Sequence, residues 1–464
     1  MENGLMSTQI KQATPEELDT PEKLGKHAVS VFGGGQAAVL QAILFTDAGF
    51  KVTFVDPDQT MINNIARGRV PFLKKETQAK MKSQEKAGSM NATSDFKEAV
   101  SHSDIIAITT PTKITYKKKT DCSEMESTCK KIGSSLQKGS LIIIMGLAGI
   151  GMTEGPIKEA LENTSGLKAG TDFGLAYSPL QTAHTQTLEE TANRQRMVAA
   201  TDKDSLRIAS LILETITKRT VRKAASIKTA EVAALLEVLQ RDVRIAFKNE
   251  AAVLCEKAGV DYIETQKIMD TSTDSPPPPS TFDNDSDNDE PYILLEDADN
   301  FNLNPRIARA ARSTNEDTVK HVTDLVRYAL KSCGKTLKRA RITVLGASQT
   351  PNAPSPFKNS ARKIVETLQA RGAKISIYDP YLSESEIVDA QYQLKKNMND
   401  AVERADCLLI LTLHEQFKRL NLRKMRLSMK APAAIVDLEN AAEPSKIEKE
   451  GFVYRGLGRG GRTR

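Results

Sequence analysis

A run of glycines near the N-terminus has the residue types and spacing that hold the pyrophosphate of a dinucleotide. Gly33, Gly35 and Ala38 fit the pattern G-x-G-x-x-G/A. The first glycine permits a tight turn, the second lets a phosphate approach the backbone, and the third small residue lets a helix pack closely on a strand. Asp56 follows where a carboxylate can bind ribose hydroxyls and select NAD over NADP. We expect NAD as a cofactor, with a turn that binds no nucleotide as the alternative.

The segments around these glycines alternate between strand and helix patterns. Residues 27–32 and 51–56 are short, apolar and rich in β-branched side chains, and residues 37–49 have helical spacing. Together they form the βαβ unit that the glycine pattern requires. Further apolar runs at residues 104–109 and 141–145 predict a parallel sheet covered on both faces.

The same alternation returns in the second half of the chain, after a stretch with helical spacing only. The predicted fold class is α/β, with two Rossmann-like doubly wound domains joined by a central long-helix segment. In chain order we expect a flexible tail (1–25), an NAD-binding domain (26–203), a central helical region (204–269), an acidic and Pro-rich loop (270–300), a helical connection (301–335), a second Rossmann-like domain (336–459) and a basic tail (460–464).

Composition excludes several classes of protein. The chain has 464 residues, of which 39% are hydrophobic and 27% charged, too apolar for a disordered chain. A net charge of +6 argues against a nucleic-acid binder, which has a dense basic face. Residues 141–151, the longest apolar stretch, are shorter than the roughly 18 residues of a membrane span. Five cysteines without a C-x-x-C pair, and no signal peptide pattern, predict a reduced, cytoplasmic protein.

Several motifs occur in a fixed order along the chain. They lie at residues 31–56, 67–72, 104–112, 177–179, 228–231, 378–380, 412–417 and 456–459. Together they resemble the nucleotide-sugar dehydrogenases, the UDP-glucose/GDP-mannose dehydrogenase family, including its UDP-N-acetylmannosamine dehydrogenase-like members. The resemblance runs from about residue 27 to residue 459, and the ordered set is more specific than any single motif.

This resemblance implies an NAD domain, a central helix that forms a homodimer and a C-terminal domain that binds a UDP-sugar. It also implies oxidation of a sugar C6 alcohol to a uronate by two hydride transfers to NAD, for polysaccharide or glycan precursors. Such chemistry needs a base, a thiolate that traps the aldehyde, and hydrolysis of the resulting thioester. Thr112 would end the strand that faces the nicotinamide, with a turn cap as the alternative role.

The chain departs from the family at the positions of the catalytic groups. By resemblance, Ser286 stands in place of the nucleophilic cysteine, Ala234 in place of a lysine, and Leu180 in place of a glutamate. Val238 replaces an asparagine, and Leu147 belongs to a segment that replaces E-S-T. A serine among carboxylates has no evident activation as a nucleophile. We therefore expect the standard two-step oxidation to be absent or greatly weakened.

Other features carry less chemistry. The loop Ser348–Phe357 lacks the Asp and Arg of a family signature that contacts the nucleotide, and we expect His414 to be structural. We expect no metal site, although four acids have the spacing of an EF-hand loop, because Glu290 replaces the glycine that such a loop requires. These acids are Asp285, Asp287, Asp289 and Glu296.

Three functions remain open. The first is an NAD-dependent UDP-sugar 6-dehydrogenase. The second is a catalytically inactive relative that acts as a binding or scaffold subunit. The third is a dehydrogenase that stops after one hydride transfer. The replaced residues favour the second function, and the intact glycine pattern keeps the other two open.

Overall fold

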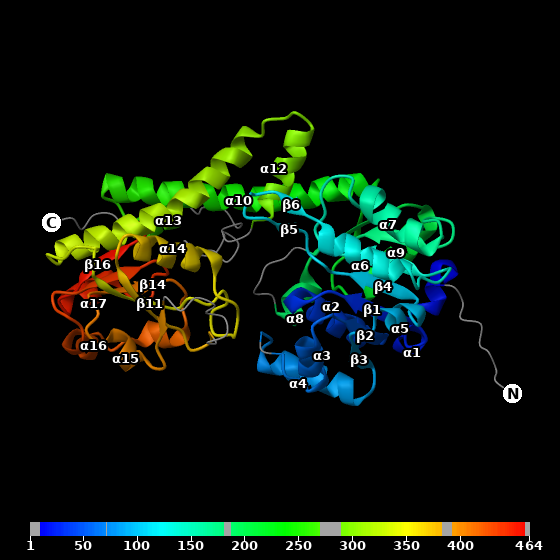
Figure 1. The fold of residues 1–464 in the computed structure, drawn as a ribbon, viewed down its shortest axis with the longest axis horizontal. Helices are drawn as coiled ribbons and strands as arrows, with labels where there is room; N and C mark the ends of the chain where they lie inside the picture. The colour runs from blue at the N-terminus through cyan, green and yellow to red at the C-terminus, as the bar shows by residue number, and fades with distance from the viewer. Residues whose placement is uncertain (1–9, 71, 181–186, 270–288, 383–391, 460–464) are drawn as a thin grey trace. The chain divides into compact units, whose positions relative to one another are not determined.

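The computed structural model describes residues 10–70, 72–180, 187–269, 289–382 and 392–459. Internal contacts divide the chain into two units. Unit 1 comprises Met1–Leu239 and Asp289–Asn304, and unit 2 comprises Gln240–Asn288 and Pro305–Arg464. Each unit is built on one large sheet with helices around it (Figure 1), and the boundary between the units falls within the long helix α10 (Ile227–Ala258). The predicted fold class is confirmed.

Unit 1 is built on an eight-stranded sheet, in the order β10-β9-β8-β7-β4-β1-β2-β3. Neighbouring strands are parallel except β8 and β9. Their bounds are β1 (Ala28–Phe32), β2 (Lys51–Val55), β3 (Met90–Thr93), β4 (Ile105–Ile108), β7 (Leu141–Ile144), β8 (Gly174–Tyr177), β9 (Met197–Ala200) and β10 (Arg222–Lys223). Because β1 pairs with both β2 and β4, the chain changes direction across the sheet there, which is where such folds bind ligands.

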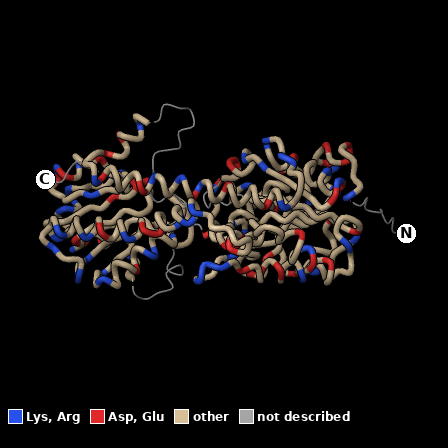
Figure 2. The backbone as a smooth tube through the Cα atoms, turned by 90° about the horizontal axis from the view of Figure 1, so that it is seen from above, with Lys and Arg blue, Asp and Glu red and all other residues tan. Residues whose placement is uncertain are grey.

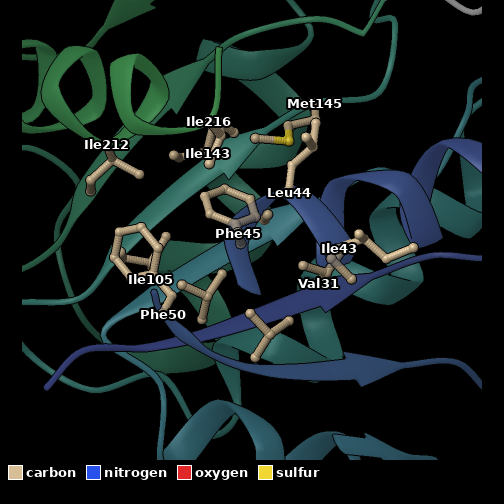
Figure 3. Close-up of a cluster of buried hydrophobic side chains, with 14 of the residues drawn as sticks. Val31, Ile43, Leu44, Phe45, Phe50, Ile105, Ile143, Met145, Ile212 and Ile216 are labelled. Atoms are coloured by element: carbon tan, nitrogen blue, oxygen red, sulfur yellow. The ribbon is translucent and has the colours of Figure 1, made fainter. Parts of the chain in front are cut away.

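Helices cover both faces of this sheet. They are α1 (Pro21–Leu24), α2 (Gly35–Ala48), α3 (Gln59–Ala66), α4 (Lys75–Lys86), α5 (Phe96–Ser101), α6 (Ser123–Gly133), α7 (Lys158–Ser165), α8 (Leu188–Asn193) and α9 (Lys203–Thr215). A further helix of unit 1, α12 (Pro291–Asn300), packs with the first half of α10. Strand side chains alternate between two cores, so that Ile105 and Ile143 join one cluster while Ile106 and Ile142 join the other. Figure 3 shows Phe45 of α2 within the first cluster.

The N-terminal segment corrects the prediction of a flexible tail over residues 1–25. Short helices cover Ile10–Gln12, Pro15–Glu17 and Pro21–Leu24. Ile10 and Leu18 are buried in the first core cluster, and Arg207 Nη1 of α9 donates to Ala13 O at 2.7 Å. Apolar side chains are too sparse here to give a helical period, so their burial depends on α9, far along the chain. Residues 1–9 lie outside the described residues.

The predicted central region also has different bounds. Helix α9 packs on the sheet of unit 1, and β10 pairs with β9 at residues 222–223. The N-terminal domain therefore extends past residue 203, and the long helix begins at Ile227, followed by α11 (Tyr262–Met269). Within the predicted loop 270–300, residues 291–300 form α12. The many acids of this segment favoured a loop, although its apolar side chains are buried along the helix.

Unit 2 contains a six-stranded parallel sheet, in the order β13-β12-β11-β14-β15-β16. The strands are β11 (Arg341–Leu345), β12 (Lys374–Tyr378), β13 (Gln393–Leu394), β14 (Cys407–Ile410), β15 (Ala434–Asp437) and β16 (Val453–Gly456). Helices α13 (Arg306–Ser332), α14 (Asn359–Ala370), α15 (Met398–Val402), α16 (Leu422–Ser428) and α17 (Pro444–Lys449) surround it.

A buried polar network joins the second half of α10 to α13 in unit 2. Arg312 Nη1 lies 3.0 Å from Asp242 Oδ1, and Asn315 Nδ2 donates to the same oxygen at 2.9 Å. Asn249 Nδ2 donates to Asn315 Oδ1 at 2.9 Å. Burial raises the pKa of Asp242. Because buried polar groups are costly without partners, this network fixes how the two helices align.

The surface carries charges of both signs. In Figure 2, Lys and Arg are interspersed with Asp and Glu along the described chain of both units. Within the described ranges, no helix is both long enough and apolar enough to span a membrane.

Candidate dinucleotide and sugar sites

The glycine run forms the turn between β1 and α2. Gly33 has a φ of +125°, and a Cβ there would lie 2.5 Å from Thr109 Oγ1, so only glycine fits. Gly35 has a φ of +84°, and a Cβ there would meet no atom within 4 Å among the described residues. Gly35 thus opens onto free space at the N-terminus of α2, which fits a pyrophosphate close to the backbone.

Asp56 lies directly after β2, beside this turn. Its side chain is buried, Oδ1 accepts a hydrogen bond from Asp58 N at 2.7 Å, and burial raises its pKa. Ala38 is fully buried in the first turns of α2, where a larger side chain would push the helix off the sheet. The residues predicted to bind the cofactor therefore lie around one edge of β1 and β2, and their individual roles stay predictions.

Thr112 follows β4 at the same edge of the sheet. Its hydroxyl donates to Leu147 O, in the segment after β7, at 2.6 Å. We predicted either a position that faces the nicotinamide or a turn cap for Thr112, and this hydrogen bond is typical of a turn cap. It also ties the segment after β4 to the segment after β7.

Three of the positions that depart from the family lie in one apolar cluster. Ala234 and Val238 of α10 are 4% and 6% exposed and pack with Leu147. Leu235 and Ile293 complete the cluster, which the half-buried side chains of Ile114, Ile150 and Leu294 flank. We call these eight residues the apolar cluster. No described member can carry charge or exchange a proton.

Leu180 lies elsewhere. It is half-buried against the core cluster of the sheet, and its backbone N–H donates to Met145 O at 2.8 Å. The structure therefore does not bring Leu180 together with Ala234 in one cluster. Ser286 lies outside the described residues.

Two carboxylates hold the segment after β7: one lies in the motif at residues 228–231, and the other was not predicted from the sequence. Glu231 of α10 is fully buried and accepts from Gly151 N at 2.6 Å and from Thr153 N at 2.9 Å. Asp297 of α12 accepts from Ile150 N at 2.8 Å. Burial raises the pKa of both carboxyl groups. They fix the backbone that carries Leu147 and Ile150 into the apolar cluster.

Helix α12 is also fastened to a hairpin of β5 (Lys113–Ile114) and β6 (Thr120–Asp121). Glu296 accepts from Thr120 N at 2.6 Å and lies 3.3 Å from Lys119 Nζ. Lys118 Nζ lies 5.0 Å from the centre of the Tyr292 ring. Burial would raise the pKa of Glu296, but the hydrogen bonds from Thr120 together with the hydrogen bond and charge of Lys119 lower it. Glu296 thus binds the backbone of Thr120 and the side chain of Lys119. Asp285 and Asp287 lie outside the described residues. Among the residues that the structure describes, no group of three or more side chains could hold a metal ion.

The carboxyl edge of the unit 2 sheet is held by Asp379. Its Oδ2 accepts from Ala347 N and Ser348 N at 2.8 and 2.7 Å and from His414 Nε2 at 3.1 Å, while Oδ1 accepts from Tyr381 N at 2.8 Å. Burial disfavours the ionised carboxylate, but the hydrogen bond and charge of His414 and the hydrogen bonds from Ser348 lower the pKa of Asp379 to about 2.

His414 is fully buried within this group. Its Nδ1 accepts from Asn352 N at 2.9 Å, which leaves Nε2 as the protonated nitrogen that faces Asp379. Ser348 Oγ lies 3.3 Å from the same Nε2, so serine and aspartate compete for one nitrogen and cannot form a proton relay through the ring. The contacts are those of a structural residue, and the role stays a prediction.

Comparison with known families covers most of the chain. Residues 27–217, 228–317 and 343–444 match the NAD binding, central and UDP binding domains of the UDP-glucose/GDP-mannose dehydrogenase family. The chain belongs to this family. NAD is its cofactor, and the residues around Gly35 and Asp56 fit the dinucleotide. The predicted resemblance is confirmed.

Individual members of the family are similar over nearly their whole length. The UDP-N-acetyl-D-mannosamine dehydrogenase of Pyrococcus horikoshii is 26% identical over 435 residues, which cover 93% of this chain and 99% of that protein. The solved structure of UDP-D-ManNAc dehydrogenase from the same organism has a TM-score of 0.83, with 94% of this chain and all of that chain covered. The UDP-glucose 6-dehydrogenase of Rhizobium meliloti is 23% identical, over 93% of this chain and 99% of that protein.

The resemblance implies a reactive thiol, and among the described residues the side chain of Cys122 contacts Thr112. Burial raises the pKa of the Cys122 thiol, and Glu126 and Asp121 raise it further, while Thr112 lowers it. Burial raises the pKa of Cys129 to about 12. A thiol with a raised pKa is a weak nucleophile at neutral pH. Neither cysteine therefore has the environment of a catalytic thiolate.

Proposed function

We propose that this chain binds NAD as its relatives do but has lost the two-step oxidation, and that it acts as a binding or scaffold subunit. The observation that carries the proposal is the apolar cluster. By the family resemblance, Ala234 and Val238 stand where a lysine and an asparagine would act, and both pack against Leu147. A buried apolar cluster offers no base for an alcohol and no donor for a developing oxyanion.

The residues of the glycine turn and Asp56 would still bind NAD. When bound, NAD supplies a hydride acceptor. Gly33 and Gly35 would let the pyrophosphate reach the backbone at the start of α2, and Asp56 would accept hydrogen bonds from the ribose. Glu231 and Asp297 would keep the segment after β7 in place beside it. Binding and catalysis thus depend on different residues, so one can persist without the other.

The alternative is an active UDP-sugar 6-dehydrogenase. The relatives that carry such names are similar over nearly their full length, and the chain matches both the NAD binding and the UDP binding domain. A third possibility is a dehydrogenase that performs one hydride transfer. Both alternatives require reacting groups from outside the apolar cluster.

The test separates binding from turnover. Calorimetric titration with NAD should give saturable binding, whereas NADH formation with UDP-N-acetylmannosamine, UDP-N-acetylglucosamine and UDP-glucose should fall at least about 10⁴-fold below the rate of the Pyrococcus horikoshii enzyme, because more than one catalytic group is replaced. One NADH per sugar would support the third function. Release of a uronate would refute the proposal.

We also propose that the chain forms a homodimer through α10. Phe247 and Leu254 lie two turns apart on this helix and are 61% and 67% exposed. Ile307 near the start of α13 is 71% exposed. Large apolar side chains that lie together on a helix mark an interface, and a second copy is the partner that the family resemblance implies.

Sedimentation velocity tests the dimer. The unaltered chain should sediment as a dimer, and Phe247→Glu should shift it toward the monomer because a carboxylate would be buried at the interface. Leu427→Glu provides the control, since Leu427 is 85% exposed on α16. A monomeric unaltered chain, or equal effects of both substitutions, would exclude this interface.

We further propose a reducing, cytoplasmic location. All five cysteines are free thiols, and Cys129, Cys255, Cys333 and Cys407 are buried. Buried free cysteines behave as small apolar residues and are typical of compartments that keep thiols reduced.

A further inference from the structure

Gly34 occupies the variable position between the two required glycines of the pattern. Its φ and ψ are −90° and 174°, a conformation that alanine adopts without strain. A Cβ there would nevertheless lie 2.9 Å from Asp56 Oδ2 and 3.9 Å from Asp56 Cγ. Apart from its chain neighbours, no other described residue has an atom within 4 Å of that position. The space beside Gly34 is therefore taken up by the Asp56 carboxylate alone.

The Asp56 carboxylate is held in this place by its own turn. Oδ1 accepts from Asp58 N at 2.7 Å, and Asp58 in turn caps α3 by accepting from Thr60 N at 2.8 Å. Only 5% of Asp56 is exposed. One carboxylate oxygen is thus anchored to the backbone, and the other reaches across the glycine turn. A side chain at residue 34 would have to displace that second oxygen.

We propose that Gly34 is a specificity-determining residue for the dinucleotide, because its missing side chain lets Asp56 reach across the glycine turn. A carboxylate in that place accepts hydrogen bonds from a free ribose 2′-hydroxyl and repels a 2′-phosphate. Gly34 acts through Asp56 and is therefore a positioning residue. The inference concerns cofactor binding, so it holds whether or not the chain oxidises a sugar.

A double-mutant cycle tests this coupling. Dissociation constants for NAD and NADP are measured by calorimetry for the unaltered chain, Gly34→Ala, Asp56→Ala and the double variant. Gly34→Ala should weaken NAD binding by about tenfold without a comparable loss for NADP, because a charged hydrogen-bond acceptor is displaced. In the Asp56→Ala background the same substitution should leave the ratio of the two constants unchanged.

Gly35→Ala is the matched comparison within the same turn. Because Gly35 has a positive φ and faces open space, alanine there should weaken NAD and NADP alike. The cofactor-free Gly34→Ala variant should melt within a few degrees of the unaltered chain, since only a side-chain end must move. The proposal is overturned if Gly34→Ala fails to fold, weakens both dinucleotides equally, or changes the ratio when Asp56 is absent.

Discussion

Replacing Ala234 with lysine should lower the free energy of unfolding by about 3–5 kcal/mol, since it would bury an ammonium in the apolar cluster. Ala234 is 4% exposed among Leu147, Val238 and Ile293, and the carboxylate of Glu231, one turn earlier, is already bonded to two backbone N–H groups. Urea unfolding monitored by circular dichroism gives the measurement. The substitution would restore the residue type that the family resemblance places at this position, yet the surroundings no longer accept it.

Ala233→Lys is the control for this substitution. Ala233 is the neighbouring residue of α10 and is half-buried, so a lysine can extend to water, and we expect a change below about 1 kcal/mol. A stable Ala234→Lys variant would mean that the position opens to solvent. If that variant also formed NADH with a UDP-sugar, the site would be a dehydrogenase site that lacks one group.

Removal of the Asp379 carboxylate should destabilise unit 2 by about 3 kcal/mol or more. Asp379→Ala would leave three backbone N–H groups and His414 Nε2 buried without their acceptor, and each unsatisfied group costs about 1–3 kcal/mol. Glu403→Ala, at an exposed position after α15, should have little effect. Equal stabilities of the two variants would show that the Asp379 contacts contribute nothing.

The same carboxylate predicts a pH dependence. The pKa of Asp379 is lowered in the folded chain from 3.8 to about 2, so the folded state favours the ionised form. Its contribution of about 2 kcal/mol is therefore complete above the unfolded pKa and is lost as the pH falls through 3.8 toward 2. The difference in stability between the unaltered chain and Asp379→Ala should shrink over this range. A constant difference would exclude the assignment.

The fold could be predicted where the signal is local. The glycine turn, strands β1, β2, β4 and β7 and the long helix each follow from spacing within one short segment, as at Gly33 and Asp56. The segment Ile10–Leu24 was mistaken for a tail because its few apolar residues have no period of their own. They become part of a core only through α9, which is distant in the sequence.

The candidate site could be predicted only in part. Resemblance identified Ala234 and Val238 as departures, but spacing could not show that they meet Leu147 and Ile293 from other parts of the chain. Glu231 lies in the motif at residues 228–231, but neither its contacts nor those of Asp297 could be predicted, because their partners are backbone N–H groups, which every residue other than proline possesses.

Helix α10 places a practical constraint on dividing the chain. Ala234 and Val238 belong to the packing of unit 1, while Asp242 and Asn249 belong to that of unit 2, and all four lie on one uninterrupted helix. A cut at the boundary after Leu239 would fray that helix and strip each fragment of part of its interior. A fragment that contains only one unit should therefore keep the whole of Ile227–Ala258. In each fragment, the end of this helix that packs on the missing unit would be exposed and without tertiary contacts.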